Sequence, residues 1–305
     1  MSHPRTIAVI GTGVIGTGWA ARCLAHGHAV VAWDPAEDSA ERLAHDMERL
    51  WPTLTKAGMS DSASLDRLTF APDLAAACRD AWLIQESVPE NMDLKLAVHR
   101  EIDQAADVHS LIASSSSGLL PSEIQAAHRH PERMFIAHPF NPVYLLPLVE
   151  LVPGTHTDAG RMAVAGDFYA SMNMHPLSLR REIEGYLSDR LQEALWREAL
   201  HLVNDDIATT GELDDAIIYG PGLRWAFMGT CLTFHLAGGQ GGMRHMLEQF
   251  GPALQLPWTH LRAPELTPAL IEKMVEGTAE QAAGQSIEAL EQLRDDCLIE
   301  IMQAL

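Results

Sequence analysis

The feature that constrains this chain most is a glycine-rich turn near its N-terminus. Residues 11–16 read GTGVIG, directly after the apolar run Ile7–Ile10 and just before a second apolar stretch, Trp19–Leu24. In such a motif the first glycine permits a tight turn, the second lets the backbone approach a pyrophosphate, and the third lets the helix pack closely on the strand. A strand, this turn and a helix in succession predict a dinucleotide-binding βαβ unit.

An acidic residue stands where such a unit selects its dinucleotide. Asp34 follows the second β-branched run, Ala29–Trp33, and lies 23 residues after the first glycine. A carboxylate there accepts hydrogen bonds from both hydroxyls of the adenine ribose and repels the 2′-phosphate of NADP. We therefore predict NAD as the cofactor. The predicted cofactor-binding residues of this unit are Gly11, Gly13, Val14, Ile15, Gly16 and Asp34.

The pattern of predicted secondary structure changes once along the chain. Up to Arg181, short β-branched runs alternate with helix-period segments, which is typical of βαβ units and a parallel sheet. Beyond it, residues 186–203 form one amphipathic run and the remainder is helix-like and poor in strands. We predict an α/β Rossmann-like N-terminal domain over residues 1–183, followed by an all-α C-terminal domain over residues 184–305.

The expected strands of the N-terminal domain are Ile7–Ile10, Ala29–Trp33, Trp82–Gln85, Ser110–Ala113, Met134–Ala137, Leu148–Leu151 and Pro176–Leu179.

Charge and cysteine usage exclude several classes of protein. Lys and Arg number 21 against 41 Asp and Glu, a net charge of −20 that repels nucleic acids and anionic lipid surfaces. The four cysteines show no CxxC spacing, and no uncharged apolar run approaches about 20 residues. We expect a cytoplasmic protein with neither nucleic-acid nor membrane partners. No metal site is predicted, and His128 and His130 are assigned to the surface.

A second group of polar residues follows three of the expected strands. It comprises the serines Ser114–Ser117, the segment His138–Pro142 (HPFNP), and Glu150 twelve residues after the histidine. A serine after the fifth strand, His-x-x-Asn-Pro and a glutamate at this spacing resemble the 3-hydroxyacyl-CoA dehydrogenase family, and the resemblance covers nearly the whole chain. It implies a Rossmann-like domain followed by a helical domain that forms a homodimer.

The resemblance also assigns roles. His138 matches the family's catalytic base, Glu150 its carboxylate partner, and Ser117 its hydroxyl-binding serine. Hydride transfer from a secondary alcohol requires a base for the hydroxyl proton, which an imidazole suits near neutral pH. Glu90 and Lys95 match a segment that lies near the nicotinamide ribose in the family.

One position departs from the family pattern. Relatives read Gly-Phe-x-x-Asn-Arg where this chain reads GYLSDR, so Asp189 replaces an amide and Arg190 follows it. The role of the amide does not transfer to an acid.

The substrate is expected to lack coenzyme A. Residues 36–57 contain three basic residues outnumbered by five acidic ones, a poor surface for the phosphates of CoA. Aromatic faces in a negative field recognise quaternary ammonium groups. The segments around Tyr144 and Trp225 resemble the branch of the family that oxidises the 3-hydroxyl of L-carnitine, a small 3-hydroxy acid with a trimethylammonium group. The expected substrate-binding residues are Phe140, Tyr144, Asp189, Arg190, Arg224, Trp225 and Phe227.

Two alternatives remain open from the sequence. Within the same class, the chain could be a 3-hydroxyacyl-CoA dehydrogenase or an L-gulonate-type 3-hydroxy acid dehydrogenase. From another class, it could be an inactive NAD-binding protein, crystallin-like or a sensor. The intact set of Ser117, His138 and Glu150 argues against the inactive alternative.

Overall fold

The computed structural model describes residues 4–226, 228–238, 242–250, 257–259, 267–271, 275 and 283–304. The chain divides into two compact units, Met1–Asp189 and Arg190–Leu305.

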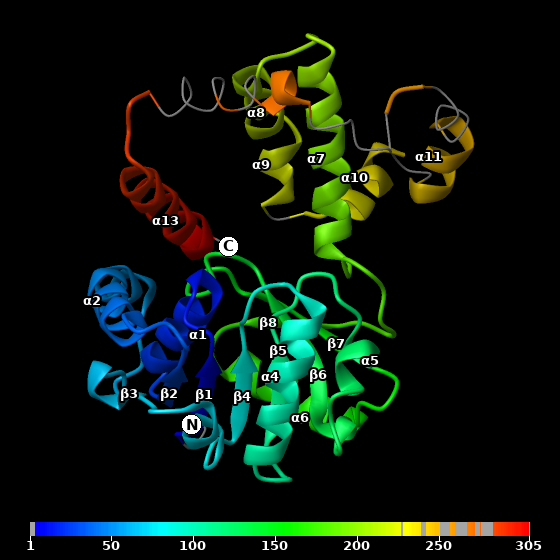
Figure 1. Cartoon of the computed structure of the whole chain (residues 1–305). Helices are drawn as coiled ribbons and strands as arrows, with labels where there is room; N and C mark the ends of the chain where they lie inside the picture. Colours follow the sequence, from blue (N-terminus) through cyan, green and yellow to red (C-terminus); the bar gives the residue numbers. More distant parts are fainter. Residues whose placement is uncertain are drawn as a thin grey trace. The chain divides into compact units, whose positions relative to one another are not determined.

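The N-terminal unit is built on one eight-stranded sheet in the order β3-β2-β1-β4-β5-β6-β7-β8 (Figure 1). The strands are β1 (Thr6–Ile10), β2 (Ala29–Trp33), β3 (Leu68–Phe70), β4 (Leu83–Glu86), β5 (Leu111–Ser114), β6 (Met134–Pro139), β7 (Leu148–Pro153) and β8 (His175–Ser178). The first six are mutually parallel in the order 3-2-1-4-5-6, which is the dinucleotide-binding arrangement. Strand β7 pairs antiparallel with β6, and β8 pairs parallel with β7.

Helices cover both faces of this sheet. One hydrophobic cluster joins the sheet to α1, α2 and α6, and a second joins it to α3, α4 and α5. The helices of this unit are α1 (Val14–Ala25), α2 (Ser39–Ala57), α3 (Leu74–Cys78), α4 (Met92–Ala105), α5 (Pro121–Gln125) and α6 (Ala159–Ser171). The predicted Rossmann-like fold is therefore confirmed.

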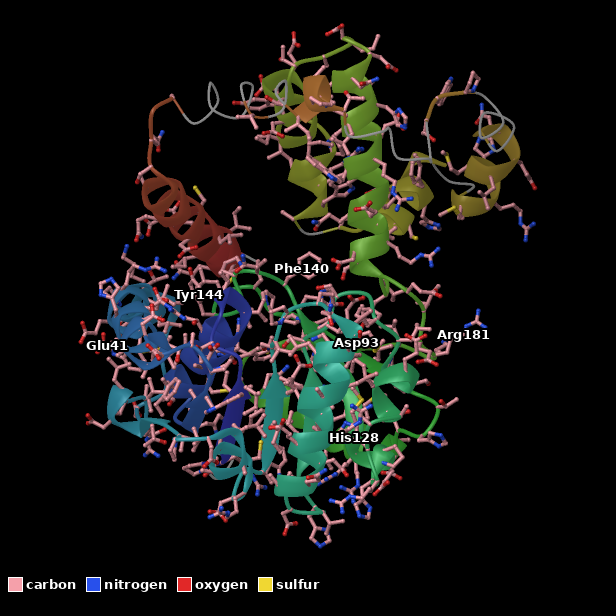
Figure 2. All side chains as sticks on the ribbon, in the orientation of Figure 1. Glu41, Asp93, His128, Phe140, Tyr144 and Arg181 are labelled. Atoms are coloured by element: carbon pink, nitrogen blue, oxygen red, sulfur yellow. The ribbon has the colours of Figure 1, made fainter. Side chains whose placement is uncertain are left out.

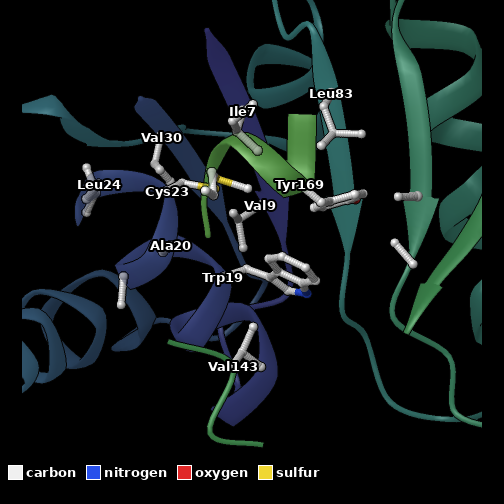
Figure 3. Close-up of a cluster of buried hydrophobic side chains, with 14 of the residues drawn as sticks. Ile7, Val9, Trp19, Ala20, Cys23, Leu24, Val30, Leu83, Val143 and Tyr169 are labelled. Carbon is white, nitrogen blue, oxygen red and sulfur yellow. The ribbon is translucent and has the colours of Figure 1, made fainter. Parts of the chain in front are cut away.

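In the core beneath the glycine-rich turn, the polar atoms of two buried aromatic side chains are hydrogen-bonded. Trp19 of α1 and Tyr169 of α6 have ring centroids 5.4 Å apart, among the apolar side chains shown in Figure 3. The Trp19 Nε1–H donates to Ser115 Oγ at 3.0 Å, and the Tyr169 hydroxyl donates to Gln85 Oε1 at 2.8 Å. Buried polar atoms without partners are costly, so these bonds fix the serine segment after β5 relative to α1 and α6.

The C-terminal unit is helical throughout its described part. Its helices are α7 (Ser188–Asn204), whose first two residues belong to the N-terminal unit, α8 (Thr210–Ile218), α9 (Pro221–Trp225), α10 (Thr230–Ala237), α11 (Gly242–Phe250) and α13 (Ile287–Ala304). Leu200 and Val203 of α7 pack with Leu270 and the partly buried Leu213. A capping box between Thr209 and Glu212 starts α8. No helix in the described part of the chain is long and apolar enough to cross a membrane.

Three details differ from the sequence expectations. Strand β3 was not expected, and the antiparallel pairing of β7 interrupts the expected parallel sheet. The assignment of His128 to the surface was wrong, because its side chain is fully buried. Its Nε2 lies 2.9 Å from Nδ1 of His99, a buried residue of α4 that supplies a partner the local sequence does not reveal.

Candidate active site

The glycine-rich turn leaves space in front of α1. Gly11 has φ +88°, and a Cβ there would lie 2.7 Å from the Ser87 carbonyl oxygen, while a Cβ on Gly16 would lie 1.8 Å from the Gly11 carbonyl oxygen. A Cβ on Gly13, the N-cap of α1, would meet no atom within 4 Å. The first and third glycines are thus required by packing, whereas the second borders open space at a helix N-terminus, where a pyrophosphate binds favourably.

Asp34 is fixed at the same turn. Its Oδ2 accepts the Thr12 N–H at 2.8 Å and its Oδ1 accepts the Ala36 N–H at 3.0 Å. Oδ2 also accepts the Thr12 hydroxyl at 3.3 Å, so Oδ1 is the carboxylate oxygen that keeps a lone pair for a ribose hydroxyl. The neighbouring strands β1 and β2 bring the turn and the carboxylate together. The residues present therefore fit NAD.

The antiparallel pair β6–β7 positions a histidine and a glutamate side by side. His138 and Glu150 are direct partners in the strand register, and His138 Nδ1 lies 3.0 Å from Glu150 Oε2. Glu150 Oε1 accepts the backbone N–H groups of Leu187 at 3.0 Å and Ser188 at 3.1 Å, and Oε2 accepts the Ser188 hydroxyl.

These bonds fix the state of the imidazole. Burial of Glu150 favours its neutral form, but the hydrogen bonds from His138, Ser188 and Leu187 outweigh that effect and lower the pKa of the carboxyl group. An ionised carboxylate only accepts hydrogen bonds, so Nδ1 of His138 carries a hydrogen. In the neutral imidazole Nε2 therefore has a lone pair and can act as a base.

The other sides of the imidazole are mostly aromatic. The rings of Phe140 and Tyr186 meet it edge-on, with centroids at 5.8 Å and 5.4 Å. Asp189 Oδ2 lies 3.5 Å from Nε2. Phe140 and Tyr144 lie beyond the carboxyl end of β6 (Figure 2). Tyr144 is partly buried and packs against the core cluster of α1.

The serine segment after β5 directs its hydroxyl groups differently. The Ser114 hydroxyl donates to Glu86, Ser115 binds Trp19 as described above, and the Ser116 hydroxyl donates to Glu90. Ser117 is exposed, and its backbone N–H donates to Glu90 Oε1 at 3.1 Å. The segment is therefore anchored through its first three hydroxyls and presents the fourth serine outward.

Glu90 and Lys95 belong to one ionic network, which is buried at Lys95 and Glu86 and reaches the surface at Glu90. Lys95 is 1% exposed, and its Nζ lies 2.8 Å from Glu86 Oε1 and 3.6 Å from Glu90 Oε2. His99 Nε2 lies 3.0 Å from the other Glu86 oxygen. Although burial opposes ionisation, the His99 hydrogen bond and the Lys95 charge lower the pKa of Glu86 to about 2.

The sequence did not indicate Glu86, His99 or Ser188 as part of the site. Glu86 ends an apolar strand, and His99 lies among charged residues of an amphipathic helix. The only available signal for Ser188 was its place beside Asp189, in the segment that departs from the family pattern.

The remaining predicted residues lie in the C-terminal unit. Arg190 and Arg224 are exposed, and Trp225 is 36% exposed. Phe227 lies outside the described residues. Their arrangement around a substrate stays a prediction.

Comparison with protein families identifies both parts of the chain. Residues 6–183 match the NAD binding domain of 3-hydroxyacyl-CoA dehydrogenase, and residues 185–286 match the C-terminal domain of the same family.

Curated relatives are similar over more than nine-tenths of their length. The chain is 57% identical over 301 residues to an L-carnitine dehydrogenase of Pseudomonas aeruginosa, covering 99% of this chain and 94% of the relative. It is 56% identical over 301 residues to an L-carnitine dehydrogenase of Bacillus cereus, covering 99% and 92%. Among solved structures, the NAD⁺-dependent 5-formyl-3-hydroxy-2-methylpyridine 4-carboxylic acid 5-dehydrogenase matches with a TM-score of 0.82 and 26% identity, over 99% of this chain and 98% of that one.

Proposed function

This chain belongs to the 3-hydroxyacyl-CoA dehydrogenase family, and from that premise we propose that it oxidises the 3-hydroxyl group of L-carnitine to 3-dehydrocarnitine with NAD. The observation that carries the reaction type is the hydrogen bond between His138 Nδ1 and Glu150, because it leaves Nε2 as a base at the carboxyl edge of the sheet. The substrate is supported by relatives named L-carnitine dehydrogenase that are 52–57% identical to this chain.

The mechanism follows from the state of the imidazole. Nε2 of neutral His138 takes the proton of the substrate hydroxyl, and the Glu150 carboxylate stabilises the imidazolium that forms. The Ser117 hydroxyl donates to the substrate oxygen as negative charge develops there. A bound NAD would supply the acceptor for the hydride that leaves C3. Because oxidation releases a proton and needs neutral His138, we expect its rate to increase with pH, while ketone reduction favours lower pH.

The cofactor would be held by the backbone of the glycine-rich turn, which borders open space, and by the carboxylate of Asp34. The backbone of Gly13, Val14, Ile15 and the neighbouring glycines would contact the pyrophosphate, and Asp34 the adenine ribose. Glu90 and Lys95 would stand next to the nicotinamide ribose. Two contacts support this placement. Lys95 is ion-paired with Glu90, and Glu90 accepts a hydrogen bond from the backbone of Ser117, the proposed substrate-binding serine.

The two ends of carnitine require different partners. Phe140 and Tyr144, with Trp225 or Phe227, would offer aromatic faces to the trimethylammonium group. Arg190 or Arg224 would bind the carboxylate. A coenzyme A substrate is disfavoured because Arg42 and Arg49, two of the few cations after β2, are ion-paired with Asp38 and Asp46.

We assign NAD binding to residues 1–183, and substrate binding with homodimerisation to the helical residues 184–305. The cysteines Cys23, Cys78, Cys231 and Cys297 are free thiols in the described structure, which supports a reducing, cytoplasmic environment.

A substrate panel tests the proposal. NADH formation is measured with L-carnitine, 3-hydroxybutyrate, 3-hydroxybutyryl-CoA, L-gulonate and the carnitine isostere whose quaternary nitrogen is replaced by carbon. We expect kcat/KM for L-carnitine to exceed that of the isostere by roughly thirtyfold, because a desolvated cation–π contact contributes about 2 kcal/mol. If 3-hydroxybutyryl-CoA or gulonate were the best substrate, the carnitine assignment would be wrong. If no alcohol reduced NAD, the enzyme assignment would fail altogether.

A further inference from the structure

His138 is almost completely enclosed by protein. Its side chain is 5% exposed, although the proposed reaction leaves a proton on it in every oxidative turnover. That proton must reach solvent before the next alcohol can be oxidised. The neighbours of the ring therefore decide the route by which it leaves.

Glu150 is unsuited to carry the proton out. Its carboxylate is fully buried and already accepts hydrogen bonds from His138, Ser188 and the Leu187 backbone. A proton placed on it would remain inside the protein and would disrupt these bonds. Glu150 therefore stabilises the imidazolium without releasing its proton.

The aromatic neighbours offer no route either. Phe140 has no polar atom. The Tyr186 hydroxyl donates to the Leu119 carbonyl oxygen at 2.8 Å, and burial raises the pKa of this phenol, so it stays protonated. Glu90, the next carboxylate around Tyr186, accepts the Ser116 hydroxyl and two backbone N–H groups of the serine segment.

Asp189 alone among these neighbours joins Nε2 to solvent within the described residues. Its Oδ2 lies 3.5 Å from Nε2 and its side chain is 32% exposed. It stands in the first turn of α7, where the helix dipole favours a negative charge. The segment that delivers it is tightly turned, with positive φ at both Gly185 and Tyr186.

We propose that Asp189 is the proton outlet of the active site, taking the proton from Nε2 of His138 and passing it to bulk water. This inference rests on the proposed function in that it needs His138 to act as the base. It gives a role to the one acid that replaces an amide of the family motif, since an amide cannot accept and release a proton near neutral pH.

The step balances without a further reactant. The substrate O–H bond breaks and an Nε2–H bond forms while the hydride leaves C3 for NAD. After the ketone departs, the Nε2–H bond breaks and the proton moves to Asp189 Oδ2 and then to water. His138 is again neutral and Asp189 again anionic, so the net products are ketone, NADH and one proton.

The separation is consistent with a transfer that occurs only when the ring is charged. A distance of 3.5 Å exceeds the range for direct transfer, about 2.6–3.2 Å, so the pair must shorten or include one water. An imidazolium facing a carboxylate is drawn toward it, whereas a neutral Nε2 lone pair is not.

The first test measures the imidazole itself in cofactor-free and substrate-free protein. Diethyl pyrocarbonate modifies imidazole only in its unprotonated form, and fragmentation of the peptide in the mass spectrometer assigns the modification to His138 and separates it from His156 of the same tryptic peptide. The groups that face the pair are Glu150 on β7, Asp189 on α7, Tyr186 before α7 and, beside Tyr186, Glu90 before α4. Of these, only Asp189 is changed in Asp189→Asn.

We expect Asp189→Asn to move the pH of half-maximal modification of His138 down by about one unit, since removal of a nearby anion favours the neutral ring. Asp80→Asn makes the same charge change at an exposed residue before the amino end of β4, whereas His138 lies near the carboxyl end of β6, so this variant should leave that pH unchanged.

The second test is chemical rescue. Asp189→Ala should lose roughly 10²-fold in turnover, the lower range for a positioned proton acceptor, and formate or acetate should restore part of it in a saturable manner. Wild type, with its own carboxylate, should not respond. If carnitine is not oxidised, the rescue is measured with whichever alcohol of the panel is, so the two proposals fail separately. Either an unmoved modification profile in Asp189→Asn or an absence of rescue in Asp189→Ala would overturn the inference.

Discussion

His138 meets one carboxylate at each ring nitrogen, and the two carboxylates differ in burial. Glu150, at Nδ1, is enclosed and holds four hydrogen bonds, while Asp189, at Nε2, is about one-third exposed. A fixed, saturated acid sets the tautomer of the ring, and a partly hydrated acid can exchange protons with water. The imidazole of His138 can therefore be oriented by Glu150 at Nδ1 and deprotonated by Asp189 at Nε2.

The first prediction concerns this pair. His138→Ala should reduce kcat by roughly 10²–10⁴ while NADH affinity stays near wild type, because the base acts on the substrate proton. Glu150→Gln should also lower kcat, since an amide no longer stabilises the imidazolium. Single-turnover NADH formation gives the rate, and NADH fluorescence gives the affinity. His130→Ala, at an exposed histidine, serves as the control. Wild-type turnover in the His138 variant would refute the catalytic assignment.

Two glycines of the β1–α1 turn have different roles, because Gly16 is needed for folding and Gly13 for ligand binding. A Cβ on Gly16 would collide with the Gly11 carbonyl oxygen, whereas a Cβ on Gly13 would project into open space. Two chemically identical substitutions, three residues apart, should thus have opposite consequences.

The second prediction is that Gly13→Ala keeps the wild-type melting temperature within a few degrees but weakens NADH binding about tenfold to a hundredfold, the effect of losing one or two charge-assisted hydrogen bonds. Gly16→Ala should instead lose about 3 kcal/mol or more of stability through overpacking against backbone. Thermal unfolding and NADH titration of both variants separate the effects. Equal NADH affinity in Gly13→Ala and wild type would contradict the open cradle.

The strands show how much of the fold could be predicted from the sequence. The strands predicted to begin at Ala29 and Met134 begin at these residues in the structure, because β-branched or apolar runs between turns are clear signals. Strand β3 is three residues long and lies at the sheet edge, so its pattern is too short to identify. The direction of β7 depends on tertiary pairing, which a strand's own residues do not encode.

The sequence likewise predicted part of the candidate site and missed the rest. His138 and Glu150 could be paired from their spacing, through the resemblance, and the structure brings them into contact. Ser188 and His99 could not, because a hydroxyl beside a helix start and a histidine on an amphipathic helix are ordinary surface features. Their importance arises only in the folded chain, where Ser188 binds Glu150 of β7 and His99 binds Glu86 of β4.

Buried ionisable groups make the stability of the fold sensitive to acid. The pKa of Glu86 is lowered to about 2, and burial followed by the neighbouring His99 lowers the pKa of His128 to about 3. Both values lie below those of the unfolded chain, so the unfolded chain binds protons first as pH falls. The histidine term is lost from about pH 6.5 down to 3, and the carboxylate term from about 4.5 down to 2.

The third prediction is therefore a melting temperature that falls as pH is lowered from 7 to 4. His128→Gln removes the histidine term, so its melting temperature should fall less steeply between pH 6.5 and 4 than that of wild type. His130→Gln, at an exposed neighbour, should keep the wild-type slope. The slopes, measured by calorimetry, are compared instead of the absolute values. Identical slopes for His128→Gln and wild type would show that buried His128 does not contribute to acid lability.

The β6–β7 pairing has a consequence for how such an enzyme can diversify. The two strands hold His138 and Glu150 in direct register, while the loop between them carries Tyr144 and is pinned by Arg22 of α1, which donates to the Val143 and Leu146 carbonyl oxygens. Partly exposed side chains of that loop, unlike the buried Val143 and Leu145, can be exchanged while the strand register and the backbone carbonyls that hold the loop are kept. Substrate selectivity can then change during evolution, or be engineered, while His138 and Glu150 stay the same.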